Sequence, residues 1–295
     1  MRAHVTNAGW RGQLAFIALL LSIATVLWFM VAALGTRFGL WNWQFGLGTM
    51  VIGYGGPITM GALAISALAL VLAFIKAPRT QPVILALGAV LISSFTLFRL
   101  VGFGAHAASL PPIHDIQTDW DNPVMFSGEL LAAREAGEAM NPVEPAPVAQ
   151  LPESARERWP GTHGQPVAEL QERAEFDPAT MEERDEAPYP YTFDTLITPA
   201  RPQAVYDTAI ALARARGWDI VTADPEAGRI EATETSPWFG FKDDVAIRIE
   251  AAEGRTRVDM RSVSRVGLSD LGANAKRVGN FMRELETRLG RRAGG

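Results

Sequence analysis

The first 114 residues contain no Asp or Glu, and three long apolar runs fill most of that stretch. The runs cover residues 13–34, 50–75 and 82–101. Each is close to the about 20 residues that a helix needs to cross a hydrocarbon core about 30 Å thick. The sequence therefore predicts an anchor of three transmembrane helices over residues 1–109, followed by a water-soluble part.

The basic residues that flank the runs predict an orientation, because Lys and Arg in short loops stay on the cytoplasmic side. Arg2 and Arg11 precede the first run, Lys76 and Arg79 separate the second from the third, and only Arg37 lies between the first two. We therefore expect a multi-pass protein of a bacterial inner (plasma) membrane, with a cytoplasmic N-terminus and a periplasmic C-terminal domain. Two further runs follow the first, which argues against a cleaved signal peptide.

Two features inside the runs have alternative interpretations. Arg99 lies near the end of the third run, where its long stem can reach the interface, although a charge inside a span can also be functional. The second run carries Gly53, Gly55, Gly56, Pro57 and Gly61. We favour close helix packing over a broken helix that lines a transport pathway, because no run contains an acidic residue or a His.

Composition limits the chemistry of the soluble part. The chain has no Cys, which excludes disulfides, thiolate metal sites and a Cys nucleophile. The part from Asp115 onward is net acidic, so no nucleic-acid partner is expected. Residues 127–190 are rich in Pro, Ala and Glu and predict an acidic connector with short helices. The connector separates residues 110–126, assigned to the soluble domain, from residues 191–290.

The pattern of residues 191–290 predicts an α+β fold. A helix should begin at Thr198 and Pro199 and end before Gly217, and a second helix should cover residues 271–289. Between them, strands are expected at residues 218–222, 229–235, 245–249 and 258–264. We therefore expect a four-stranded antiparallel sheet packed by two helices.

The first of two polar motifs spans residues 111–123 and contains His114, Asp115, Asp119 and Asp121. Carboxylates and an imidazole suit a metal ion, and His114 is also a candidate general base. The alternative is that these side chains hydrogen-bond backbone groups in turns. We favour the turns and expect no metal, because the regular spacing and the Gly of a calcium loop are missing.

The second polar motif spans residues 261–277 and crosses from the last strand into the final helix. Its candidate residues are Arg261, Ser264, Arg265, Ser269, Asp270 and Asn274. Two guanidinium groups beside a helix N-terminus suit a carboxylate or phosphate ligand. We favour a structural alternative, in which Ser269 or Asp270 caps the helix and the arginines pair with acids such as Asp115, Asp119 or Asp243. In one version, the two motifs meet as an Arg–Asp network in the core.

An aromatic run between the second and third strands contains Trp238, Phe239 and Phe241. These rings are candidates for contact with the membrane surface or a partner, because exposed aromatic residues gather at interfaces. The alternative is that they complete the hydrophobic core, and the sequence leaves both interpretations open.

Together, the two motifs resemble the bacterial and plastid family called domain of unknown function 1499. The likeness rests on two sets of residues: Ile113, His114, Asp115, Ile116, Thr118, Asp119, Asn122 and Pro123, and Arg261, Ser262, Ser264, Arg265, Gly267, Ser269, Asp270, Gly272 and Asn274. It covers about residues 110–289, interrupted by the connector. Members commonly have two prolines after the aspartate near Asp121, whereas Asn122, Pro123 and Val124 follow here. The resemblance implies a fold and a membrane-anchored arrangement, but no reaction.

Two functions from different classes follow. The favoured one is a non-catalytic envelope module without a cofactor, which contacts membrane lipids through its helices and presents its domain to an envelope protein or lipid. The alternative is a hydrolase or metal-dependent enzyme that uses His114 and the nearby carboxylates. A nucleophile elbow of the Gly-x-Ser-x-Gly type is absent from the sequence.

Overall fold

The computed structural model describes residues 9–175 and 193–293. It divides into two compact units. The first contains the N-terminal helices and the short turn Pro237–Gly240, and the second contains the remaining residues from Ala107 onward.

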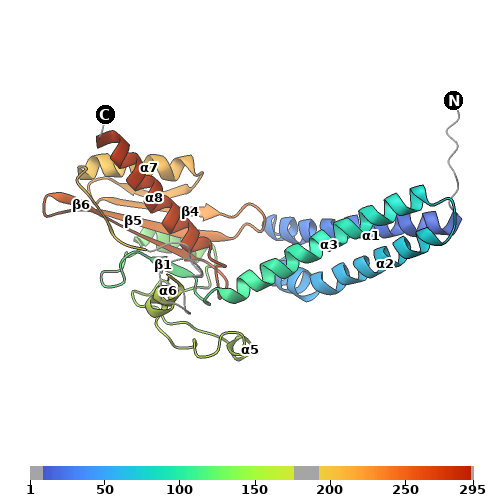
Figure 1. Cartoon of the computed structure of the whole chain (residues 1–295). Helices are drawn as coiled ribbons and strands as arrows, with labels where there is room; N and C mark the ends of the chain where they lie inside the picture. The colour runs from blue at the N-terminus through green and yellow to red at the C-terminus, as the bar shows by residue number, and fades with distance from the viewer. Residues whose placement is uncertain (1–8, 176–192, 294–295) are drawn as a thin grey trace. The chain divides into compact units, whose positions relative to one another are not determined.

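The first unit consists of α1 (Gly9–Arg37), η1 (Gln44–Gly53), α2 (Gly55–Ile75) and α3 (Thr80–Ser109) (Figure 1). Three segments are long and apolar enough to cross a membrane, if η1 and α2 are taken as one span from Gln44 to Ile75. All three predicted runs lie inside these segments. The wider π-helical winding of η1 passes into α2 at Tyr54, between two of the glycines for which a broken helix was the less favoured interpretation.

Small side chains let the helices of this unit pack closely. A buried cluster joins the three spans, and its members are Ala15, Ala18, Ala69, Ala86 and Ala89. Next to it, Ser93 Oγ donates to Ser22 Oγ at 2.8 Å, and Ser22 Oγ lies 3.1 Å from the Ala89 carbonyl oxygen. Among the glycines of the second span, Gly55 makes room for a neighbour, because a Cβ there would lie 2.7 Å from the Phe29 ring. Close packing of small residues is typical of membrane helices.

The second unit contains an antiparallel sheet with the strand order β1-β6-β5-β4-β3 in its described part. The strands are β1 (Asp115–Gln117), β2 (Leu196–Thr198), β3 (Asp219–Asp224), β4 (Arg229–Thr235), β5 (Lys242–Ala252) and β6 (Arg255–Ser264). The four predicted strands correspond to β3–β6. The two additional strands both pair with β6, and three residues each are too few for alternation to reveal them.

Helices α7 (Pro202–Ala215) and α8 (Ala273–Ala293) cover one face of the sheet (Figure 1). Val258 and Met260 of β6 point into the core on this side, where Trp218 stacks on Phe281 of α8 with ring centroids 5.3 Å apart. Helix α7 begins three residues later than predicted, because Thr198 belongs to β2. Gly217, at a φ of 74°, follows its C-terminus as predicted.

The opposite face of the sheet is covered by part of the predicted connector. Helix α4 (Gly128–Ala136) places Leu130 in a small apolar cluster with Val263 of β6 and Ala246 of β5. Helices α5 (Glu153–Arg156) and α6 (Val167–Glu175) follow, and α6 adds Leu170 to the main core. The connector therefore also contributes packing to the domain, while residues 176–190 lie outside the described residues.

One side chain of α6 completes the outer edge of β1. The Gln171 amide nitrogen donates to the Gln117 carbonyl oxygen at 2.9 Å, and its amide oxygen accepts from the Gln117 backbone N–H at 3.2 Å. The side-chain amide thus pairs with the backbone N–H and C=O of Gln117 as a further strand would. This pairing protects the free edge of the sheet.

Candidate functional site

Alternation along β6 sends two sets of polar side chains to opposite faces of the sheet. Met260 points toward α7 and α8, so its neighbour Arg261 points to the face that α4 covers. On this reverse face, beyond Asp259 with its partners Arg248 and Arg257, lie three further buried carboxylates and three buried arginines. We call this group the reverse-face network: Arg134, Arg261, Arg265, Asp115, Glu231 and Asp244. The three positive and three negative charges balance, as burial of charge requires.

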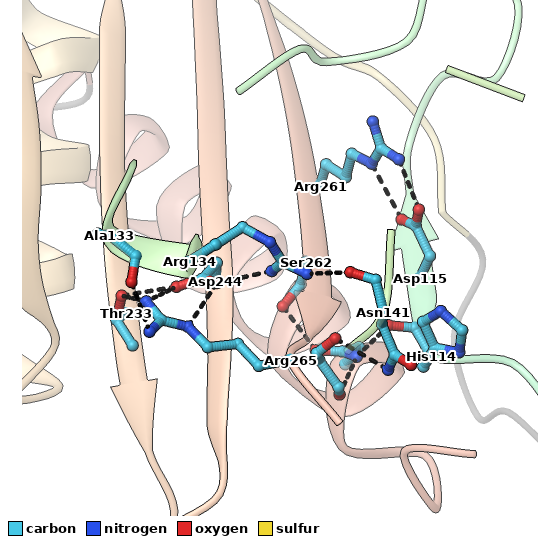
Figure 2. A network of polar contacts seen from close by, with 12 residues as sticks. His114, Asp115, Ala133, Arg134, Asn141, Thr233, Asp244, Arg261, Ser262 and Arg265 are labelled. Atoms are coloured by element: carbon cyan, nitrogen blue, oxygen red, sulfur yellow. Dashed lines mark hydrogen bonds and ion pairs between the residues drawn. The ribbon is translucent and has the colours of Figure 1, made fainter. Parts of the chain in front are cut away.

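Arg261 and Asp115 form a bidentate pair at the centre of the two motifs (Figure 2). Arg261 Nε donates to Asp115 Oδ1 at 3.0 Å and Nη2 donates to Oδ2 at 2.6 Å. Arg261 is 0% exposed and Asp115 is 1% exposed. Arg261 Nη1 and Nη2 also donate to the carbonyl oxygens of Val124 and Glu144, at 3.1 and 2.7 Å. The pair is therefore closed, and it joins β1 to β6.

Asp244 binds two arginines from different elements (Figure 2). Arg265 Nε and Nη2 donate to its carboxylate at 2.9 and 2.8 Å, and Arg134 Nη1 of α4 donates at 2.6 Å. Thr233 Oγ1 adds a fourth bond at 2.6 Å. Burial lowers the pKa of Arg134, and the charge of Asp244 opposes that change. Asp244 thereby connects α4, β4 and the end of β6.

Glu231 of β4 holds the N-terminus of α4. Its carboxylate accepts the Ser127 backbone N–H at 2.6 Å and also the Ser127 hydroxyl. The same hydroxyl oxygen accepts the Leu130 backbone N–H at 3.2 Å, so Ser127 is the N-cap of α4. The first turn of α4 is thus fixed to the sheet.

On the opposite face, Asn274 of α8 connects the two motifs. Its Nδ2 donates to Ser264 Oγ at 2.9 Å and to the His114 carbonyl oxygen at 3.0 Å, and its Oδ1 accepts from Ser262 Oγ at 2.7 Å. One turn further along, Arg277 forms an ion pair with Asp243 at 2.5 Å. These groups fix the start of α8 to β6 and β5.

The loop before α8 caps that helix. Asp270 Oδ1 and Oδ2 accept the backbone N–H groups of Gly272 and Asn274, each at 2.8 Å. Burial raises the pKa of Asp270 to about 6, and these two donors oppose the rise. Ser269 Oγ donates to the Pro111 carbonyl oxygen at 3.3 Å. Asp270 thus caps α8, and Ser269 joins the second motif to the first.

The acidic residues of the first motif are separated. Asp119 Oδ1 accepts the backbone N–H groups of Asp121 and Asn122, each at 3.0 Å, and its carboxylate also pairs with Arg257. Asp121 is exposed. Within residues 9–175 and 193–293, no group of three or more His, Asp or Glu side chains is arranged to hold a metal ion.

His114, like Gln117 with its Nε2, is a residue of the first motif whose side chain has a buried polar atom without a hydrogen-bond partner among the described residues. In His114 this atom is Nδ1. Burial lowers the pKa of His114, while the charge of Asp115 and a hydrogen bond with the Leu268 backbone act in the opposite direction. The neutral imidazole is therefore the favoured form in the folded domain.

We predict that the pKa of His114 in the folded domain lies below the ordinary value of 6.5. The contribution of this residue to stability is present above that value and is lost as the pH falls through the lower pKa of the folded state. Since the chain has four His, selective ¹⁵N-His labelling can follow each ring by NMR, with His114→Gln for assignment and His163→Gln as the control. A midpoint for His114 at or above 6.5 would contradict the prediction.

The aromatic candidates occupy the turn between β4 and β5. Trp238 is 56% exposed, whereas Phe239 and Phe241 are partly buried. The turn is closed by a 2.8 Å hydrogen bond from the Ser236 backbone N–H to the Phe241 carbonyl oxygen. Trp238 therefore lies outside the hydrophobic core, and its role as a contact residue stays a prediction.

Several residues of this polar architecture were not among the sequence candidates: Arg134, Asn141, Glu231, Asp244 and Arg277. The sequence pattern could have indicated the positions of two of them. Arg134 follows Leu130 by four residues, so both share one helix face. Asp244 alternates with Val245, which places it on the face of Arg261.

The fold defines a class of protein, an α+β domain carried by a chain with three helices that can cross a membrane. The family described as "Protein of unknown function (DUF1499)" matches residues 115–285, and the chain belongs to this family. The match contains the second motif and the part of the first motif from Asp115 onward, so the resemblance to this family is confirmed. A search of curated proteins found no match.

Proposed function

We propose that the chain is an inner-membrane protein of bacteria that presents a non-catalytic α+β domain in the periplasm to a protein or lipid partner. The observation that carries the proposal is that the arginines of the second motif are already paired with buried carboxylates of the same domain. The two arginines at the end of β6 are held in buried ion pairs, the bidentate Arg261–Asp115 pair and the Arg265–Asp244 pair. Such pairs hold elements of the fold together and offer no free charge to a reacting group.

The enzymatic alternative receives less support from the same contacts. A general base needs a positioned partner and access to substrate. Asp115, the nearest carboxylate in sequence to His114, is occupied by Arg261, and Asp119 is occupied by its turn and by Arg257. Recognition through exposed side chains such as Trp238 fits these contacts better.

The periplasmic position rests on the distribution of basic residues around the three spans. Fusing alkaline phosphatase or green fluorescent protein to the C-terminus of the full chain tests it. We expect phosphatase activity and no fluorescence, because alkaline phosphatase is active and green fluorescent protein is dark after export. The reverse pattern would place the domain in the cytoplasm.

Photo-crosslinking and metal analysis of the full chain test the choice between binding and catalysis. A benzophenone amino acid at Trp238 should form adducts with a lipid or a protein in cells, whereas the same group at the exposed Arg255 should not. A tightly bound divalent metal that disappears in His114→Ala but stays in His163→Ala would favour the enzyme and refute the non-catalytic proposal.

A further inference from the structure

Arg99 places a positive charge inside an apolar helix. Helix α3 continues from Arg99 to Ser109, ten residues further, which is about 15 Å at the α-helical rise. The side chain is exposed on the helix surface. Because a charge within a bilayer is costly, such residues normally have a partner or reach the interface with their stem.

The unit that contains Arg99 has no acidic residue to serve as this partner. The chain has no Asp or Glu before Asp115, and the turn Pro237–Gly240 has none either. The counter-charge for Arg99 must therefore come from outside this unit. In a membrane, the abundant anionic group at the ends of the spans is the phosphate of a phospholipid.

An apolar cavity of about 520 Å³ lies beside Arg99. Helices α1 and α3 are in close contact at Ser22 and Ser93, where the side chains are small. Further along both helices the side chains are larger, and the cavity opens there. Among the residues that line it are Phe29, Met30, Val51, Phe95, Thr96 and Arg99. Its volume falls in the range of about 300–1,000 Å³ that is usual for small-molecule sites.

We propose that this cavity binds a phospholipid, with an acyl chain between α1, η1 and α3 and the phosphate on the Arg99 guanidinium. A guanidinium can bind a phosphate through two parallel charge-assisted hydrogen bonds. Free phosphate would pair with Arg99 but would not contact the apolar walls of the cavity. An acyl chain without a phosphate would contact the walls but leave Arg99 without a counter-charge. This site adds a specific position to the lipid contact of the proposed function. Of that function, it requires only that the three helices span a membrane.

The test uses the full chain in mild detergent, freed of lipid and titrated with phosphatidylglycerol in native mass spectrometry. Arg99→Gln should weaken binding roughly tenfold, as the loss of a charge-assisted contact implies. Arg79→Gln removes the same charge from the loop before α3 and should leave binding unchanged. Diacylglycerol with the same acyl chains lacks the phosphate, and it should bind weakly to the wild type and equally weakly to Arg99→Gln.

Equal binding of phosphatidylglycerol to the wild type and Arg99→Gln, or tight binding of diacylglycerol, would overturn the proposal. Arg99→Lys keeps the charge and should restore part of the affinity, while an unchanged melting temperature shows that the variants fold. Thr96→Phe should fill the cavity and reduce binding with Arg99 in place, and full binding to it would also overturn the proposal. The fusion reporters read orientation alone, so their failure is distinguishable from failure here.

Discussion

Asp244→Ala should reduce the stability of the α+β domain by about 3–5 kcal/mol, because it leaves buried guanidinium groups without their counter-charge. Asp244 is 0% exposed and pairs with both Arg134 and Arg265. A domain of this kind is stabilised by only about 5–15 kcal/mol in total. Hydrogen exchange of the full chain in detergent measures the loss, and peptides from α4 should lose protection together with those from β5 and β6.

Two further variants make this test specific. Asp219→Ala removes an exposed carboxylate from the same sheet and should change stability by no more than about 0.5 kcal/mol. Adding Arg134→Met to Asp244→Ala removes one of the two unpaired charges and should recover part of the loss. If Asp244→Ala were as mild as Asp219→Ala, the reverse-face network would not hold α4 to the sheet.

The sequence predicted the elements that have a long periodic pattern. The three spans, β3–β6 and the final helix were found from apolar runs, alternation and the turn around Gly228. Strands β1 and β2 were missed because their pairing is decided by contacts with β6 rather than by a pattern of their own. The role of α4 in packing was hidden by the Pro- and Ala-rich composition around it.

For the polar motifs, the sequence predicted the kind of contact better than the partners. Pairing of the arginines with acids was expected, and the structure pairs Arg261 with Asp115, one of the acids named. Arg265 pairs with Asp244, whereas the neighbouring Asp243 pairs with Arg277 on the other face. Adjacent residues of a strand point to opposite faces of the sheet. A difference of one position along β5 therefore decides which arginine a carboxylate can reach.

Arg261→Met and Asp115→Leu should each destabilise the domain by about 3–5 kcal/mol, and the double variant should be more stable than either single one. Each single change leaves one buried charge without its partner, whereas the double change replaces the closed pair by apolar side chains. Hydrogen exchange of peptides from β1 and β6 measures all three variants. Arg255→Met, at an exposed position of the same strand, is the control and should be nearly neutral.

The double variant also separates a structural role of the Arg261–Asp115 pair from a binding role. If Arg261 holds β1 on β6, the Arg261→Met, Asp115→Leu chain should fold and still form the crosslinks expected at Trp238. If Arg261 instead binds an anionic ligand, Arg261→Met alone should leave the fold nearly intact and abolish those crosslinks. The contacts favour the first outcome, because each guanidinium nitrogen of Arg261 has an acceptor within the protein, at distances of 2.6 to 3.1 Å. A ligand would have to displace these acceptors from a side chain that is 0% exposed.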